Sequence, residues 1–268
     1  FRSTNPLWKG PCSDEWNGGV TQSMLSRFMS CRERFRLRYV LGLVPADKWN
    51  HKIGYGQMWH VCEEQLAQGS HWEEALLKHY NEQVRKYPIQ QNEISRWMQI
   101  CNMQFQEYVE YWSDHPDVLN RRSVEFERVF NVQYPLPSGR VVRLRGRRDS
   151  VDTITDEINP SGALYLQENK TKGNVDKISI ERNITYDLQT MMYLTAMHYD
   201  YLEESLPIAG VRYNVVRRPF SGGKGNIVAH KAKSNKTKGT FTPEETESEL
   251  IERLRRDYIA IEPDYWFF

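Results

Sequence analysis

Two carboxylates and one lysine in the middle of the chain have the types and spacing of a metal-dependent hydrolytic site. Asp149 lies near the end of an alternating segment, and Glu168 and Lys170 stand two positions apart in a later one. Side chains at i and i+2 of a strand project from the same face, so Glu168 and Lys170 are expected to point together. A tight hairpin between the two segments would place Asp149 beside Glu168. The sequence therefore predicts one cluster of three side chains.

Such a cluster suits hydrolysis of a phosphodiester bond. Carboxylate oxygens bind Mg²⁺ or Mn²⁺ and leave coordination positions for water and phosphate. A bound dication makes its water more acidic and offsets charge on the phosphate. Lys170 could hold and polarise the attacking water, and the carbonyl of Asn169 could be a further ligand. An acid-x-Lys pair is also a common surface ion pair worth roughly 0–1 kcal/mol. The surrounding residues must therefore distinguish a catalytic pair from a surface ion pair.

Three further residues could complete the site. Gln189 and Tyr193 are four apart on an expected helix and therefore share a face. The amide and the phenol could contact phosphate or orient the lysine, while Tyr193 could equally be part of the core. His60 follows Gly54 and Gly56, and it could complete a metal shell, touch the substrate or have a structural role.

The elements that must position these residues are three strands, a helix and a fourth strand. Alternation and turn residues indicate that the three strands form an antiparallel meander. We expect the strands at about 124–130, 141–151 and 164–170, the helix at about 183–203 and the fourth strand at 209–216.

The region before the meander is expected to be helical. Residues 1–20 read as an irregular arm, a first helix starts at Thr21 or Ser23, a second covers about 57–68, and 71–118 is a mostly helical insertion. A last helix is expected to open at Thr242. The predicted fold is α/β (α+β), with a central mixed sheet flanked by helices. Residues 21–268 are expected to form a single domain.

Charge and cysteine placement limit the partners. The net charge is +1, but residues 212–240 hold eight Lys and Arg and no acid, whereas 241–268 hold eight acids and three Arg. A basic face suits a polyanion such as DNA. No apolar run approaches ~20 residues and no signal peptide is visible, so we expect a cytoplasmic protein and no membrane. None of the four cysteines forms a C-x-x-C pair, which argues against a zinc or iron–sulfur site.

The order of these residues resembles the RecB/AddB-type branch of the PD-(D/E)XK nuclease superfamily, which includes CRISPR-associated and phage recombination exonucleases. RLRGRRDSVD resembles its metal-binding strand, ALYLQENKTKG its E-x-K strand and YDLQTMMYLTAM its Q-x-x-x-Y helix. IGYGQMWH resembles its Gly-x-x-x-His motif, and SMLSRFMSCRERFRLRYVLGL its first helix. The resemblance covers roughly residues 21–62 and 123–216.

The resemblance implies a restriction-endonuclease-like core and a role for each residue. Asp149 and Glu168 would bind the metal with His60, Lys170 would be the catalytic lysine, and Gln189 and Tyr193 would position DNA or the lysine. Several relatives hold an iron–sulfur cluster through one early and three C-terminal cysteines. Cys31 has the first position here, but the C-terminal three are missing, so no cluster is predicted.

The function implied is a Mg²⁺- or Mn²⁺-dependent DNA exonuclease in recombination, repair or phage DNA processing, within a bacterial or phage-infected cell. It would act on single-stranded or frayed ends, with a helicase or recombination partner because no phosphate-binding loop is present. The alternatives are a non-catalytic DNA-binding or assembly subunit and a structure-specific endonuclease. The expected DNA contacts are Arg34, Arg145, Arg147, Arg148, Lys224, Lys231 and Lys233.

Overall fold

The computed structural model describes residues 2–3, 7–45, 48–203, 205–220, 226–236 and 239–268. Its chain contacts group into two compact units. Unit 1 comprises residues 1–48, 121–168 and 177–212, and unit 2 comprises residues 49–120, 169–176 and 213–268. Lys224, one of the expected DNA contacts, lies outside the described residues.

A four-stranded sheet holds the strand that carries the acid-x-Lys pair. Its order is β3 (Arg121–Phe126), β6 (Ser150–Ile154), β7 (Ala163–Lys172) and β8 (Ile208–Arg217). β6 runs antiparallel to both β3 and β7. Leu164 N–H donates to the Pro207 carbonyl where β7 and β8 begin, and Arg218 N–H donates to the Lys172 carbonyl where they end. β8 is therefore parallel to β7, and the predicted mixed sheet is confirmed.

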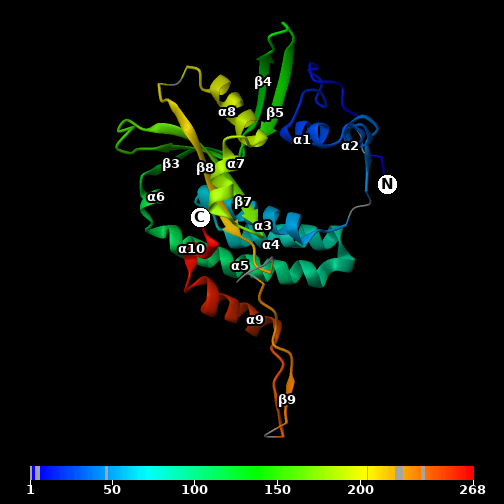
Figure 1. Cartoon of the computed structure of the whole chain (residues 1–268), viewed down its shortest axis with the longest axis vertical. Coiled ribbons are helices and arrows are strands. Elements are labelled where there is room, and N and C mark those ends of the chain that lie inside the picture. The colour runs from blue at the N-terminus through cyan, green and yellow to red at the C-terminus, as the bar shows by residue number, and fades with distance from the viewer. Residues whose placement is uncertain (1, 4–6, 46–47, 204, 221–225, 237–238) are drawn as a thin grey trace. The chain divides into compact units, whose positions relative to one another are not determined.

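Two predicted strands are each broken in the middle. The expected strand at 124–130 is β3 followed by β4 (Val129–Pro135), and the expected strand at 141–151 is β5 (Val141–Arg147) followed by β6. Both breaks are held against each other, because Glu127 N–H donates to the Asp149 carbonyl at 2.8 Å. β4 and β5 pair with each other, from Val129 opposite Arg147, and form a hairpin separate from the four-stranded sheet (Figure 1).

The helices of unit 1 begin at residues that suit helix starts. Thr21 caps α1 (Gln22–Ser30) by accepting from Met24 N–H, as predicted. The expected single first helix is divided, because Cys31 is extended at φ −165° before α2 (Arg32–Phe35) and a π-helical turn, η1 (Arg36–Val40). The helix expected from Asn183 is two helices, α7 (Lys177–Ile184) and α8 (Leu188–Asp200), and Asp187 caps the second. Short strands β1 (Arg2–Ser3) and β2 (Leu43–Val44) pair in this unit.

The core of unit 1 lies between α8 and the strands. Its fully or nearly buried members come from β4, β6, β7 and α8, and they are Phe130, Val132, Val151, Leu164, Leu166, Met192, Tyr193, Ala196 and Met197. Burial of this apolar surface, at about 25 cal/mol per Å², fixes the face of α8 that meets the strands. Gln189 and Tyr193 lie on that helix, so the same packing fixes their direction.

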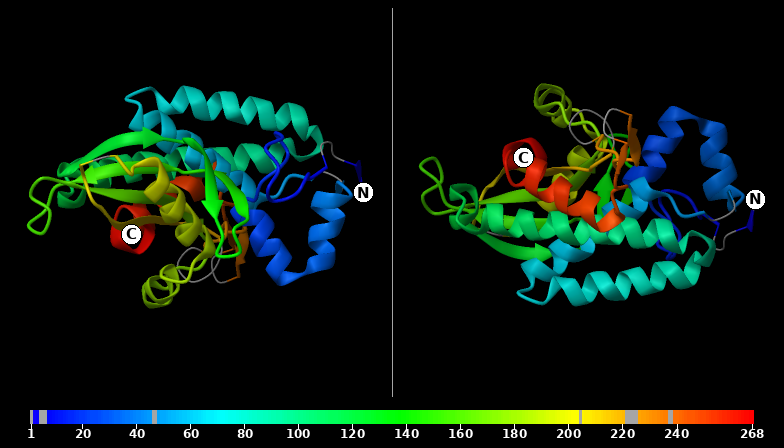
Figure 2. Two further views of the ribbon diagram at one scale, coloured as in Figure 1. Left: turned by 90° about the horizontal axis from the view of Figure 1, so that it is seen from above. Right: turned by 90° about the horizontal axis from the view of Figure 1, so that it is seen from below.

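Unit 2 is mainly helical. α3 (His51–Ala67), α4 (Trp72–Lys86) and α5 (Gln91–Ser113) pack on one another, as Figure 2 shows for α4 and α5. The other elements are η2 (Pro88–Gln90), α6 (Pro116–Leu119), β9 (Lys233–Asn235), β10 (Thr240–Thr242), α9 (Glu247–Leu254), η4 (Arg255–Ile259) and α10 (Pro263–Trp266). Large buried side chains such as Trp59, Phe105 and Trp266 fill its core. In the described part of the chain, no helix combines the length and the apolar character that a membrane crossing requires.

Two predicted helix starts in unit 2 are wrong. α3 begins at His51, capped by Asn50, and it includes Gly54 and Gly56 rather than following them. Gly54 is needed for packing, since a Cβ there would lie 2.5 Å from the Trp49 ring nitrogen. The last helix opens at Thr246, not Thr242, through a complete capping box with Glu249.

Candidate active site

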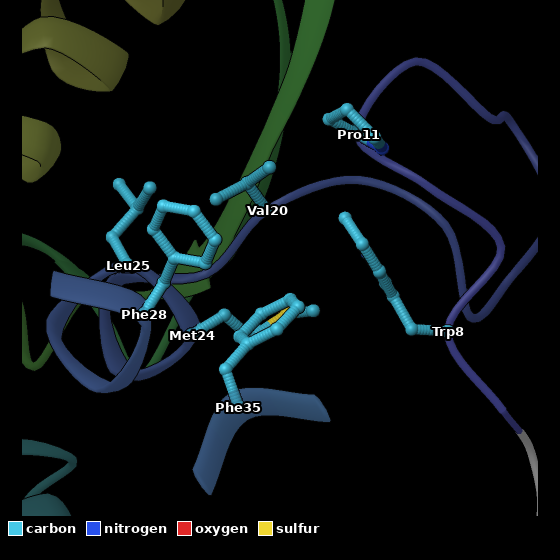
Figure 3. A pocket seen from close by; sticks show the side chains of 7 residues that line it. All are labelled: Trp8, Pro11, Val20, Met24, Leu25, Phe28 and Phe35. Carbon is cyan, nitrogen blue, oxygen red and sulfur yellow. The ribbon is translucent and has the colours of Figure 1, made fainter. Parts of the chain in front are cut away.

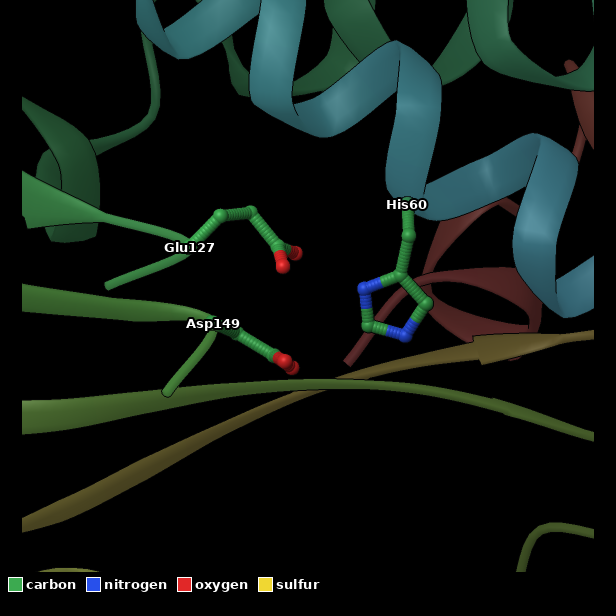
Figure 4. A group of neighbouring side chains, drawn as sticks. All are labelled: His60, Glu127 and Asp149. Atoms are coloured by element: carbon green, nitrogen blue, oxygen red, sulfur yellow. The ribbon is translucent and has the colours of Figure 1, made fainter. Parts of the chain in front are cut away.

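Two carboxylates meet where the strands break. Oxygens of Glu127 and Asp149 lie within 4.8 Å of each other, and both side chains project the same way from adjacent strand ends (Figure 4). Glu127 adopts φ 43°, a left-handed conformation that costs a non-glycine residue roughly 1–2 kcal/mol. Its N–H is nevertheless fixed on the Asp149 carbonyl. The strained backbone thus directs the Glu127 side chain toward Asp149.

The third carboxylate follows from the strand register. Ser150 on β6 pairs with Gln167 on β7, so the next position along sets Asp149 beside Glu168, as the sequence predicted. Glu168 is fully buried, and its Oε2 accepts a 2.7 Å hydrogen bond from Gln189 Nε2. Unit 1 therefore brings together Asp149, Glu168 and Gln189, three residues chosen from sequence alone.

Tyr193 belongs both to the core and to this cluster. Its ring packs edge-on against Phe130 with centroids 5.2 Å apart. Burial, followed by the negative charges of Glu168 and Asp149, raises the pKa of Tyr193 to about 12, although hydrogen bonds from the Arg147 backbone and the Gln189 side chain oppose the shift. At neutral pH its hydroxyl is protonated and lies close to the carboxylates.

The second half of β7 belongs to unit 2. Asn169 Oδ1 accepts a 2.9 Å hydrogen bond from Asn214 on β8. Lys170 Nζ lies 5.8 Å from the centre of the Tyr213 ring, and the lysine is half-buried. Alternation along β7 puts Glu168 and Lys170 on the same strand face and Asn169 on the opposite one. The lysine thus shares a face with the buried acid.

His60 lies on α3, and the turns beside it pack against strands in unit 2. A Cβ on Gly56, one turn earlier, would lie 3.2 Å from Thr171 Oγ1 of β7. Glu63, three residues later, accepts a 2.9 Å hydrogen bond from Asn214. His60 lies between these two positions of α3 and is half-buried. The small Gly56 therefore lets this face of α3 approach the unit 2 end of β7.

The three arginines before Asp149 have different surroundings. Arg145 donates to the Trp16 carbonyl, and burial lowers its pKa, with repulsion from Arg143 as a smaller cause. Arg147 is 66% exposed and pairs with Glu127 at 2.7 Å. Arg148 is fully buried between Glu125 and Asp200, each 2.8 Å away. The expected DNA contact at Arg148 does not fit this burial, because the strand break turns its side chain inward.

The remaining basic residues of the expected DNA track lie at the surface. Arg34 on α2 is exposed, as are Lys231 and Lys233 near β9.

Glu127 is the acidic residue that sequence reasoning missed. The segment EFERVF gives no sign of a break, because no glycine, proline or asparagine marks the left-handed position.

A model of the PD-(D/E)XK nuclease superfamily matches residues 20–266. The chain belongs to this superfamily. A search of the curated proteins found no match. Members of the PD-(D/E)XK superfamily are metal-dependent nucleases, and the donor set fits that chemistry. Clustered carboxylate oxygens are the ligands that Mg²⁺ and Mn²⁺ prefer.

Proposed function

We propose that this chain is a divalent-metal-dependent DNA exonuclease of the RecB/AddB type. It would hydrolyse phosphodiester bonds at DNA ends during recombination, repair or phage DNA processing. The observation that carries the proposal is the position of Asp149, directly before β6, beside Glu168 on the paired strand β7, with Gln189 donating to Glu168. A surface ion pair would not need a fully buried acid or a helix residue that holds it.

The proposed metal site draws on four predicted ligands and one found in the structure. The predicted set is Asp149, Glu168, His60 and the carbonyl of Asn169, and Glu127 joins it because its oxygens lie near those of Asp149. When bound, Mg²⁺ or Mn²⁺ would make a coordinated water more acidic and offset charge on the phosphate. The approach of α3 to β7 at Gly56 supports the choice of His60.

The other residues would act on the water and on the acids. Lys170 would hold the attacking water by hydrogen bonding and accept or donate a proton at Nζ. Gln189 would fix one oxygen of Glu168 and so orient the carboxylate that binds the metal. The protonated Tyr193 hydroxyl would donate to a carboxylate or a phosphate oxygen. In each case the polar group is already in place before the substrate binds, so the reaction requires little reorganisation of the active site.

DNA would be held mainly through its phosphates. Apart from the buried Arg148, Arg145 and Arg147 are the expected contacts closest in sequence to Asp149, and Arg34, Lys231 and Lys233 would extend the track. Contacts of this kind bind without strong sequence preference and weaken with salt. Because no nucleotide-hydrolysis motif is visible in the sequence, strand separation would come from a helicase or recombination partner.

The test is digestion of end-labelled linear DNA and of a closed single-stranded circle with Mg²⁺ or Mn²⁺. We expect linear DNA to be degraded and the circle to resist, and Lys170→Ala to lose at least about 100-fold in rate, as general acid–base groups contribute. Lys78→Ala, the same change at an exposed position of α4, is the control. Cutting of the circle would indicate an endonuclease, and binding without cleavage at any metal concentration would indicate a non-catalytic subunit.

A further inference from the structure

An apolar pocket lies in unit 1, away from the carboxylates. Its volume is about 220 Å³, and its exposed wall is entirely apolar (Figure 3). Three aromatic rings, Trp8, Phe28 and Phe35, stand around it, with Val20 and Met24 between them. Phe28 remains 44% exposed although it is a large apolar side chain. The core-forming contacts of unit 1 therefore leave this wall open.

The aromatic walls are held in place by other contacts. Trp8 Nε1 donates a 2.7 Å hydrogen bond to the Gly19 carbonyl, and Trp8 N–H donates to the Tyr39 carbonyl. Phe35 meets both Trp8 and Phe28 edge-on, with centroids 5.1 and 5.4 Å apart and interplanar angles of 87°. A preformed aromatic wall needs little ordering when a flat ligand enters, so binding there costs less entropy.

The helices that form the pocket are strongly basic. Arg27, Arg32, Arg34, Arg36 and Arg38 lie between residues 22 and 40, where Glu33 is the one acid. Glu33 pairs with Arg36 at 2.7 Å, which leaves an excess of four positive charges. The Arg32 guanidinium lies 5.5 Å from the centre of the Phe28 ring. An apolar aromatic pocket with cations beside it complements a ligand that is flat, apolar and attached to phosphate.

The pocket is connected to the carboxylates within the same unit. Val20 N–H donates to the Arg143 carbonyl, and Arg145 N–H donates to the Val20 carbonyl, so the pocket wall is fastened to β5. Leu144, which Val20 faces, precedes Asp149 by five residues, and β5 ends at Arg147 just before the break that contains Asp149. On the other side, Leu25 packs against the core cluster that contains Tyr193.

We propose that this pocket binds one unpaired nucleobase of a DNA strand whose neighbouring phosphates contact the arginines of residues 27–38. The inference rests on the proposed nuclease function and adds a base-stacking subsite to it. Stacking of bases on aromatic side chains is tolerant of sequence, since every base has a flat face. The subsite would therefore favour frayed or single-stranded ends over closed duplex, because a paired base cannot enter.

The experiment measures fluorescence anisotropy of a labelled single-stranded oligonucleotide, without metal, on the Lys170→Ala protein. One abasic nucleotide is moved along the oligonucleotide from its end. We expect one position at which loss of the base weakens binding about 5- to 100-fold, the range that stacking supports. The added change Phe28→Ala should weaken binding of the intact oligonucleotide and remove the difference between intact and abasic DNA.

Met29→Ala is the matched control, because Met29 is a 74% exposed neighbour on the same helix that does not line the pocket. Added to the Lys170→Ala protein, it should leave the affinities for intact and abasic DNA unchanged. Equal binding of intact and abasic DNA at every position would overturn the inference, and so would an unchanged abasic effect in Phe28→Ala. If that variant does not fold, the abasic scan decides alone. Cleavage by the unsubstituted protein without an abasic effect removes the subsite but leaves the nuclease function.

Discussion

Gln189 Nε2 on α8 and Glu168 Oε2 on β7 are joined by a hydrogen bond of 2.7 Å. The acid is fully buried, so this bond satisfies one of its oxygens and holds the carboxylate in a single orientation. Groups that orient a metal ligand are typically worth about 10- to 100-fold in metal affinity or activity. Under the proposed function, the Gln189 amide is a positioning residue, and the effect of its loss should be measurable apart from folding.

For Gln189→Ala we expect a cleavage rate about 10- to 100-fold lower at fixed metal concentration, partly recovered when Mg²⁺ is raised. The measurement is rate against metal concentration. Thr195→Ala on the same helix, whose hydroxyl bonds only to the Met191 carbonyl in the described contacts, should leave the curve unchanged. A Gln189→Ala curve that overlays the unsubstituted one would show that Glu168 needs no such partner.

Glu127 can be tested for metal binding separately from stability. Glu127→Gln keeps the shape of the side chain but removes a charge near Asp149, so we expect Mn²⁺ affinity in calorimetric titration to fall about 10-fold or more. Glu157→Gln, in the exposed turn between β6 and β7, removes the same charge elsewhere and should bind Mn²⁺ normally. Equal affinity in both variants would remove Glu127 from the site.

The backbone at Glu127 gives a second expectation. Glu127→Gly relieves a left-handed conformation worth roughly 1–2 kcal/mol but adds freedom to the unfolded chain worth about 0.4–1 kcal/mol. The free energy of unfolding in urea should therefore stay within about 1 kcal/mol while metal affinity falls. A large loss of stability would mean that the side chain, rather than the turn, holds the two strand breaks together.

Arg148 and Arg147 should behave in opposite ways. Arg148→Ala leaves Glu125 and Asp200 without their shared buried cation, so unfolding in urea should become about 3–5 kcal/mol easier. Arg147→Ala breaks a mostly exposed pair and should cost about 0–1 kcal/mol, while reducing the salt dependence of DNA binding. The reverse result, stable Arg148→Ala with weakened DNA binding, would restore Arg148 to the DNA track.

The segment next to the basic residues 231–236 is held by hydrogen bonds to the Glu245 carboxylate, and these should weaken in acid. Glu245 accepts from Arg253 at 2.6 Å and from the His230 N–H at 2.9 Å, and the Arg253 bond is the main reason that the pKa of Glu245 is lowered to about 2. A lowered carboxyl pKa contributes stability that is full above about pH 4.5 and is lost as the pH falls toward about 2.

Glu245→Gln should therefore lower the unfolding temperature at pH 6 and reduce its dependence on pH between about 4.5 and 2. Thermal unfolding followed by circular dichroism at several pH values makes the comparison. Glu244→Gln, the neighbouring exposed acid, is the matched control. If both variants keep the same acid sensitivity as the unsubstituted chain, Glu245 does not anchor this segment.

The sequence predicted the cluster because antiparallel pairing follows from alternation and turn residues. A hairpin between the two segments was enough to place Asp149 near Glu168, although the exact register depends on the longer loop 155–162 rather than on the turn residues 159–162 alone. The spacing of Gln189 and Tyr193 set them on one helix face. Arg148 could not be placed in this way. Alternation in RLRGRRD predicts its direction only while the strand continues, and the break after Arg147 changes the parity.

The errors in the helices have a similar origin. Glycine usually marks a helix boundary, but Gly54 allows close packing against Trp49, five residues earlier, and Gly56 allows close packing against Thr171, which is distant in the sequence. The break at Glu127 depends on a hydrogen bond to Asp149 across the sheet. Such long-range contacts override the conformational preference of the local residues, and they cannot be predicted from the neighbouring sequence.

Strand β7 has a consequence for how this protein could be divided. The boundary between the two units falls after Glu168, so the acid is the last residue of one unit and Asn169 and Lys170 open the next segment of the other. A fragment comprising either unit alone would carry half of the acid-x-Lys motif. Under the proposed function, neither fragment would hold both the acid and the lysine, so neither should cleave DNA.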